Sequence, residues 1–141
     1  MARGHLTYRV GNEENPGDPF GRSLLEVAPD GSARLDHFAR GGIKRAWSGR
    51  VEAAALERLW AALDRAGFPQ VPKHPIVGGA TMRGLTVGDR RAMVEWHAAR
   101  KLAGYDEAFG LLDTIVRQLS QDIVKRTPAA GEAIVRDVSV A

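Results

Sequence analysis

The clearest pattern of apolar and polar positions in the chain runs from Val51 to Phe68. Its apolar residues recur at steps of three and four, which places them on one face of a helix with charged residues opposite. Gly67 follows the last periodic residue, where a helix favours a left-handed cap, and Phe68 is then expected to fold back onto Leu63. The pattern predicts an amphipathic helix whose inner face consists of Leu56, Leu59, Trp60, Leu63 and Ala66.

A second helical pattern follows Gly104 and runs from Tyr105 to about Lys125. Asp106 and Glu107 lie in its first turn, where the helix dipole favours acidic side chains. We expect its apolar stripe to form one core with the first helix and with an alternating strand over 91–98. The stripe consists of Tyr105, Phe109, Leu112, Ile115, Val116 and Leu119, and the strand contributes Ala92, Val94 and Trp96.

Short alternating runs bounded by turn residues predict the other strands. The expected strands span 5–10, 23–28, 33–38, 43–48, 81–87 and 91–98. Two longer loops interrupt them. Residues 11–21 are rich in turn formers, and residues 69–80 contain three prolines, so we expect the latter to cross the surface in extended form.

The resulting element order is β-β-β-β-α-β-β-α, with tight turns that favour antiparallel pairing. A parallel sheet would need a crossover helix between successive strands, and the chain does not have them. We therefore predict an α+β fold, a two-layer sandwich in which an antiparallel meander sheet of about five or six strands carries two amphipathic helices on one face. Residues 1–126 are expected to form a single domain, and residues 127–141 a flexible or loosely docked tail.

Composition narrows the functional classes only slightly. No apolar run approaches the roughly 20 residues that span a bilayer, and the N-terminus lacks the apolar segment of a signal peptide, so we expect a cytoplasmic location. The absence of cysteine excludes disulfides and thiolate chemistry. A net charge of +3 is too small an excess to indicate nucleic acid as the partner.

The sequence contains no motif for catalysis or cofactor binding. Its four histidines are not spaced as metal ligands, its serines lack a GxSxG setting, and its glycine pairs lack phosphate-binding spacing. We therefore assign no catalytic residue, metal or cofactor. An alternative polar site stays open at Asp36, Glu95 and His97, because a carboxylate beside His97 could raise the pKa of the imidazole and orient it. We favour the simpler interpretation that Glu95 and His97 belong to the exposed polar half of an amphipathic strand.

Basic residues are more suggestive. The segment 40–50 contains four basic residues and no acidic residue, and a second basic group surrounds the last hairpin. On adjacent strands the two groups would form one face that attracts an acidic partner. The competing interpretation is that these side chains only keep the protein soluble. The candidate binding residues are Arg40, Lys44, Arg45, Arg90 and Arg91.

The run RGGIKRAWSGRVEAAALERLWAALDRAGFPQVP, residues 40–72, resembles the Gly-Gly strand, single helix and proline-containing exit of small bacterial emfourin-type protease inhibitors. It is more loosely similar to bacterial immunity-type proteins. The first strand, the acidic loop within residues 11–21 and the long second helix depart from that pattern. The resemblance implies a protein that acts by binding another protein, and it assigns no inhibitory residue.

Two functional hypotheses follow. The first is a non-enzymatic protein-binding module, such as an inhibitor or immunity-type protein, that uses its sheet face or its loops. The second is a small-ligand-binding protein or minor enzyme with a pocket near Asp36, Glu95 and His97. Aromatic residues that could stack on bases are sparse in the basic segments, which argues against single-stranded nucleic acid as a partner.

Overall fold

The computed structural model describes residues 4–11, 22–38, 44–73, 82–95, 98–120 and 139–140. At residues 11, 44, 139 and 140 it describes the backbone alone. Its strands are β1 (Leu6–Gly11), β2 (Arg22–Val27), β3 (Ser32–Phe38), β4 (Lys44–Val51), β5 (Met82–Val87), β6 (Arg90–Glu95) and β7 (Ser139–Val140). The helices are α1 (Ala53–Ala66), the short 3₁₀ helix η2 (Ala98–Lys101) and α2 (Tyr105–Leu119).

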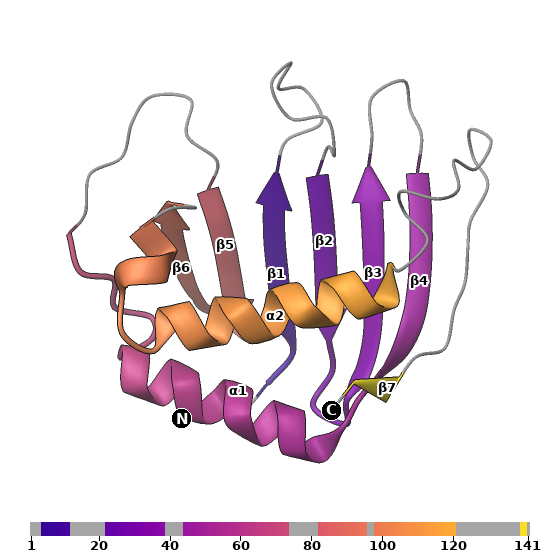
Figure 1. Cartoon of the computed structure of the whole chain (residues 1–141), viewed down its shortest axis with the longest axis horizontal. Coiled ribbons are helices and arrows are strands. Elements are labelled where there is room, and N and C mark those ends of the chain that lie inside the picture. The colour runs from indigo at the N-terminus through magenta and orange to yellow at the C-terminus, as the bar shows by residue number, and fades with distance from the viewer. Residues whose placement is uncertain are drawn as a thin grey trace.

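The strands form one sheet in the order β6-β5-β1-β2-β3-β4-β7 (Figure 1). Strands β1 to β6 pair antiparallel, and β7 pairs in parallel with the end of β4. The first strand therefore lies in the interior of the sheet, where it joins the four-strand meander to the β5–β6 hairpin. A two-strand hairpin is marginal by itself, so its pairing with β1 is what integrates it into the domain.

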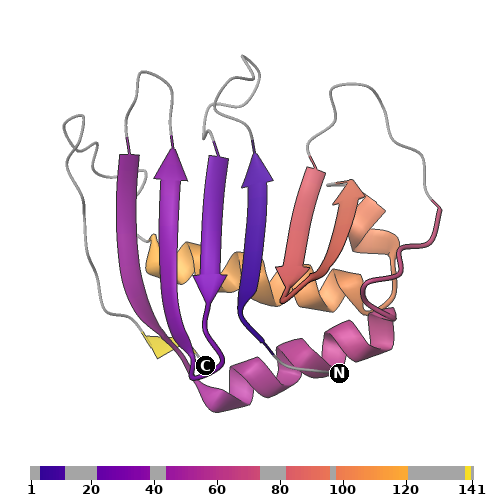
Figure 2. The same cartoon turned by 180° about the vertical axis from the view of Figure 1, so that it is seen from behind.

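The α+β fold expected from the sequence is confirmed, and the helices lie to one side of the sheet. Helix α2 crosses that face, whereas α1 lies next to α2 along one end of the strands (Figure 1). Seen from behind, the opposite face of the sheet carries none of the helices that the structure describes (Figure 2). This arrangement gives one face packed on the core and one that faces away from it, which is the usual division for an antiparallel sheet. We call the second the outer face.

Helix α1 begins two residues later than its apolar pattern suggests. Val51 is still in β4, where it is buried and pairs with Val140, and Glu52 is extended (φ −65°, ψ 150°) before the helix starts at Ala53. The expected C-terminal cap is present. Gly67 has φ 77°, and the N–H of Phe68 donates to the carbonyl of Leu63 over 3.1 Å. The ring of Phe68 is buried, as the capping motif requires.

One continuous core joins the helices to the sheet. The expected alternation of Ala92 and Val94 toward the helices is confirmed, while Trp96 lies outside the described residues. In the middle of the inner face, directly opposed residues of neighbouring strands make a fully apolar row, which is the unit of packing in an antiparallel sheet. From β6 to β4 the row is Ala92, Leu85, Tyr8, Leu25, Leu35 and Trp47.

Gly104, just before α2, lies close against the backbone of α1. Its φ is 82°, and a Cβ atom there would lie 2.3 Å from the nitrogen of Ala66. Only glycine satisfies both requirements. The following residue, Tyr105, is fully buried, stacks on Phe109 and donates its hydroxyl to the carbonyl of Gln70 over 2.6 Å.

Further differences from the sequence expectation lie at the ends of α2 and β6 and in the expected tail. Helix α2 ends at Leu119, with the hydroxyl of Ser120 bonded to the carbonyl of Val116, rather than near Lys125. Strand β6 is described to Glu95, and Ala98, which was expected to end this strand, belongs to η2; residues 96–97 lie outside the described part. In the expected tail, Ser139–Val140 forms β7 on β4, and residues 127–138 lie outside the described part. No helix in the described residues is long and apolar enough to cross a membrane.

Candidate functional site

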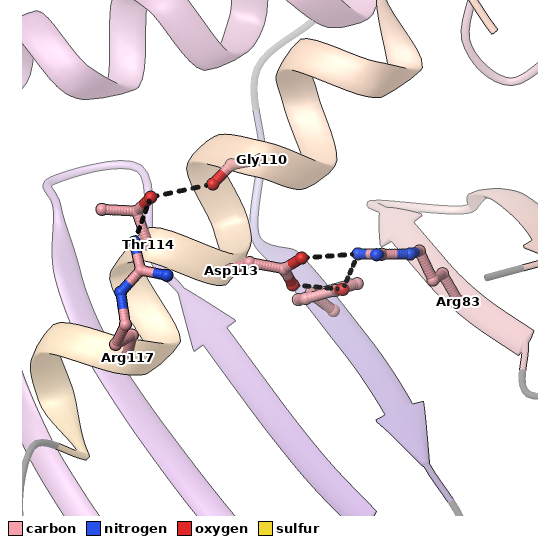
Figure 3. A network of polar contacts seen from close by, with 6 residues as sticks. Arg83, Gly110, Asp113, Thr114 and Arg117 are labelled. Atoms are coloured by element: carbon pink, nitrogen blue, oxygen red, sulfur yellow. Dashed lines mark hydrogen bonds and ion pairs between the residues drawn. The ribbon is translucent and has the colours of Figure 1, made fainter. Parts of the chain in front are cut away.

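Arg83 is a charged residue at a buried position. It alternates in phase with Leu85 and Val87, so β5 directs it toward the helices, and its side chain is only 4% exposed. Its Nη1 donates to the Tyr8 hydroxyl over 2.7 Å and to Oδ2 of Asp113 over 2.8 Å (Figure 3). The guanidinium carbon lies 5.2 Å from the centre of the Phe109 ring, within cation–π range. These contacts tie β5, β1 and α2 together at one point.

Tyr8 completes this cluster. Its hydroxyl donates to Oδ1 of Asp113 over 2.7 Å while accepting from Arg83. Burial, and then the negative charge of Asp113, raise the pKa of Tyr8 far above its ordinary value. The phenol therefore stays neutral and serves as a donor and acceptor, which suits a fixed link better than a proton-transfer group.

A hollow of about 140 Å³ opens beside this cluster, between α2, β5 and η2. Its floor includes Arg83 and the ring of Phe109, and we call it the α2 hollow. Its volume corresponds to that of roughly five water molecules, which is well below the 300 Å³ or more typical of drug-sized ligand sites. The lining residues are Arg83, Ala99, Arg100, Asp106, Phe109, Gly110 and Asp113.

Gly110 lies in the middle of α2, where glycine costs about 0.5–1 kcal/mol relative to alanine. At Gly104 packing explains the glycine, but a Cβ at Gly110 would meet nothing within 4 Å. The carbonyl of Gly110 accepts the Thr114 hydroxyl over 2.9 Å, and Thr114 in turn accepts from Arg117 (Figure 3). These contacts would be possible with a side chain at position 110. Packing among the described residues therefore does not explain why this residue is glycine.

Arg83 and Asp113 were not predicted as a pair, although the sequence contains a signal for it. Arg83 occupies the apolar phase of its strand, and Asp113 follows Phe109 by four residues, which puts both on the same side of α2. Two opposite charges at positions that the periodicity marks as inward are most easily accommodated as a partnered pair. Which strand faces α2 could not be read from the pattern, because it depends on the β1–β5 pairing.

The alternative polar site is not assembled by the described residues. Asp36 on β3 and Glu95 on β6 both face outward, but four strand spacings, roughly 19 Å, separate them. The carboxylate of Asp36 accepts Nε and Nη2 of Arg34, and Oε2 of Glu95 accepts the N–H of Ala98 over 2.7 Å. Both carboxylates therefore have structural partners. The third member, His97, lies outside the described residues.

The two basic groups expected to merge lie near opposite edges of the sheet. Strands β4 and β6 are five spacings apart, roughly 24 Å, or about three Debye lengths at physiological salt, so their fields do not sum. Arg45 faces the helix side, is 8% exposed and lies opposite His37. Arg90 also faces that side, with its guanidinium 6.0 Å from the centre of the Phe68 ring.

Arg91, in contrast, is exposed on the outer face. The side chain of Lys44 and all of Arg40 lie outside the described part.

The outer face nevertheless carries a different set of basic residues. The β-strand alternation and the pairing register place one arginine on each of five strands, pointing away from the helices. Four are exposed and the one on β2 is half-buried. We call this set the arginine face. It consists of Arg9 on β1, Arg22 on β2, Arg34 on β3, Arg50 on β4 and Arg91 on β6.

Three of these arginines have structural contacts. Arg34 binds Asp36, whose hydrogen bonds and charge raise the pKa of the guanidinium, Arg50 donates to the carbonyl of Asp30, and Arg22 lies 4.6 Å from the centre of the Phe38 ring. Arg9 and Arg91 have no hydrogen bond or ion pair with any residue in the described part of the chain. These two are the members of the arginine face that are available to a partner.

Among the described residues, no three histidine, aspartate or glutamate side chains gather closely enough to hold a metal ion. Comparison of the sequence with models of known protein families and with curated proteins finds no match.

Proposed function

We propose that this protein is a non-enzymatic protein-binding module whose arginine face binds an acidic surface on another protein. The observation that carries the proposal is the placement of an arginine on each of five strands on the face that no described helix covers. By the pairing register, neighbouring members lie one strand apart, or two between Arg91 and Arg9, with offsets of two to four residues along the strands. This places them roughly 8–14 Å from one another, or about one to two Debye lengths. Their fields therefore overlap and would accelerate the approach of an acidic partner.

Features of this face support a protein partner over nucleic acid. Glu26 and Asp36 lie between the arginines on β2 and β3, where they would repel a continuous line of phosphates. Phe38, the outer-face ring in the described residues, is half-buried with Arg22 stacked over it. Met93, which is 48% exposed and lies two strands from Arg9, offers instead the kind of apolar contact that protein interfaces use.

An inhibitor or immunity-type protein would be a module of this kind. Such proteins act by occupying a partner's surface, and they need a rigid scaffold with a charged face rather than reactive groups. We propose this class on the combination of a broad basic sheet face with a continuous core behind it. The partner's defining feature would be a cluster of aspartate and glutamate side chains.

The experiment is capture of partners from a native lysate with immobilised protein, followed by identification of the captured proteins by mass spectrometry. Arg9→Glu with Arg91→Glu reverses the two arginines that make no hydrogen bond or ion pair within the described part of the chain, so the fold should be retained. The matched control reverses two exposed helix arginines, Arg58→Glu with Arg117→Glu, and changes the net charge equally.

The proposal expects a specific captured protein that the control retains and the outer-face variant loses. Equal capture of that protein by both variants would contradict the arginine face as the binding surface. Capture of nucleic acid alone, removed by nuclease treatment, would contradict the protein-binding proposal.

A further inference from the structure

A second binding site, independent of the arginine face, is indicated on the helix side of the molecule by the α2 hollow. Three observations bear on what it would hold: a glycine without a packing role, the charges of its lining and its size.

Gly110 keeps the wall of the hollow free of a side chain. Glycine in a helix centre is destabilising, and a Cβ here would meet nothing within 4 Å. Asp106, Gly110 and Asp113 follow one another at steps of four and three, so they form one stripe of α2 with the glycine between two carboxylates. Because Gly110 has no side chain, the stripe contains a gap between the two carboxylates, where another molecule can approach the helix backbone.

The charges of the lining are balanced. At the floor, Arg83 and Asp113 neutralise each other through a 2.8 Å ion pair. Two further lining residues, Arg100 on η2 and Asp106 on α2, are exposed and carry opposite charges. Among the described residues no side chain pairs with Arg100, and Asp106 accepts only the N–H of Glu107, over 2.8 Å.

This lining favours a ligand that carries both charges and no net charge. An anion would meet the two carboxylates, and a cation would meet the two guanidinium groups. A zwitterion satisfies both sides, with its carboxylate on Arg100 and its ammonium group on Asp106. The volume of about 140 Å³ suits a ligand with only a few heavy atoms beyond its charged groups.

We propose that the α2 hollow binds a small free α-amino acid, with Arg100 and Asp106 holding its charged groups and the Gly110 gap admitting its Cα substituent. Phe109 and Ala99, each about 1% exposed, are the apolar residues of the lining against which that substituent would lie. Because the hollow lies on the opposite side of the sheet from the arginine face, the proposal does not depend on the proposed protein partner.

The test is an NMR titration of ¹⁵N-labelled protein with glycine, alanine and valine, and separately with acetate and methylammonium. We expect saturable shifts at η2 and the first half of α2 with glycine and alanine. We expect weaker binding of valine, because its branched side chain fills more of the hollow. Acetate and methylammonium should each bind at least about tenfold more weakly, since each uses one of the two charged contacts.

Variants sharpen the test. Arg100→Gln and Asp106→Asn should each weaken the binding of alanine about tenfold or more, while Arg117→Gln, on α2 but outside the hollow, should leave it unchanged. Gly110→Ala should weaken binding while raising the midpoint of thermal unfolding, a combination that a purely structural glycine would not show.

Equal affinity for acetate or for methylammonium would overturn the zwitterion assignment. The absence of shifts with every amino acid, or binding insensitive to both Arg100→Gln and Asp106→Asn, would overturn the site.

Discussion

At the scale of single residues, the unusual feature is a fully buried arginine. The side chain of Arg83 is held by Tyr8 and Asp113, and its guanidinium carbon lies within cation–π range of the Phe109 ring. A buried ion pair is weak evidence for net stability, because desolvation offsets much of the attraction. Its loss is costly all the same, since removing one partner leaves the other charge uncompensated.

We expect Asp113→Asn to lower the free energy of unfolding by about 3 kcal/mol, at the lower end of the range for a broken buried pair because Asp113 is 35% exposed. Chemical denaturation measured by circular dichroism gives this value directly. Asp106→Asn, on the same helix but exposed, is the control and should cost only about 0.5 kcal/mol through the helix dipole. Equal effects of the two variants would mean that Arg83 does not depend on Asp113.

The two tyrosines provide a second residue-scale prediction. Burial raises the pKa of Tyr105 to about 12, and the pKa of Tyr8 is raised further by burial and by Asp113. An unfolded tyrosine has a pKa of about 10. Above about pH 10 the unfolded chain therefore loses protons that the folded chain keeps, so stability falls as pH rises through this window.

Because Tyr8 and Tyr105 are the two tyrosines of the chain, tyrosinate absorbance follows both without interference from others. We expect it to remain low above about pH 10 while the circular dichroism is native, and to rise together with unfolding. A tyrosinate transition with a midpoint near 10 in native protein would show that these rings are accessible and not buried.

At the scale of elements, much of the secondary structure could be predicted from apolar spacing. The 3.6-residue period identifies both helices and their inner faces, and the Gly67 cap follows from the local sequence alone. Boundaries were less certain where two patterns overlap. Val51 suits the start of a helix and the end of a strand equally well, and its pairing with Val140 favours the strand.

Leu63→Ala is expected to cost about 2–5 kcal/mol, because Leu63 is completely buried at the centre of the α1 face. Thermal and chemical unfolding of the variant beside the parent measure this loss. Ala61, exposed on the same helix, offers the matched control as Ala61→Ser, for which we expect a change of less than about 1 kcal/mol. Parent-like stability of Leu63→Ala would mean that the inner face of α1 has been assigned wrongly.

The junction between α1 and α2 gives a prediction with an internal control. Gly104 and Gly67 both have positive φ, but a Cβ at Gly104 would collide with Ala66, whereas a Cβ at Gly67 would meet nothing within 4 Å. Gly67→Ala should therefore cost about 1 kcal/mol from backbone strain alone. Gly104→Ala should cost at least about 2 kcal/mol more through the clash.

Denaturation curves of both variants test this difference. Equal losses would show that the helices can separate at Gly104 without penalty.

At the scale of the whole molecule, the order of the strands in the sheet determines which basic residues lie on the same face, and this order could not be predicted from the sequence. Placing β1 between β2 and β5 depends on contacts across most of the chain, and no local pattern records them. Separation along the chain placed Arg45 in one predicted basic group and Arg90 and Arg91 in another, and the two groups were expected to merge into one face. In the fold, Arg45 is buried on the inner face, while Arg9, which was in no group, is exposed on the outer one.

The α2 hollow could not be predicted from the sequence for the same reason. The residues that line the hollow form no recognisable motif in the sequence, and the hollow arises only where η2 and α2 meet β5. The molecule therefore presents two candidate surfaces on opposite sides of one sheet, a broad basic face and a small charge-balanced hollow.

The most direct test of the central claim is the association rate of the purified protein with its captured partner, measured by stopped flow across a range of ionic strength. The arginine face predicts a parent rate that falls steeply as salt rises, and an Arg9→Glu, Arg91→Glu variant slower by about tenfold at low salt with a weaker salt dependence. The Arg58→Glu, Arg117→Glu control should follow the parent. Parent-like rates and salt dependence in the Arg9→Glu, Arg91→Glu variant would contradict binding through this face.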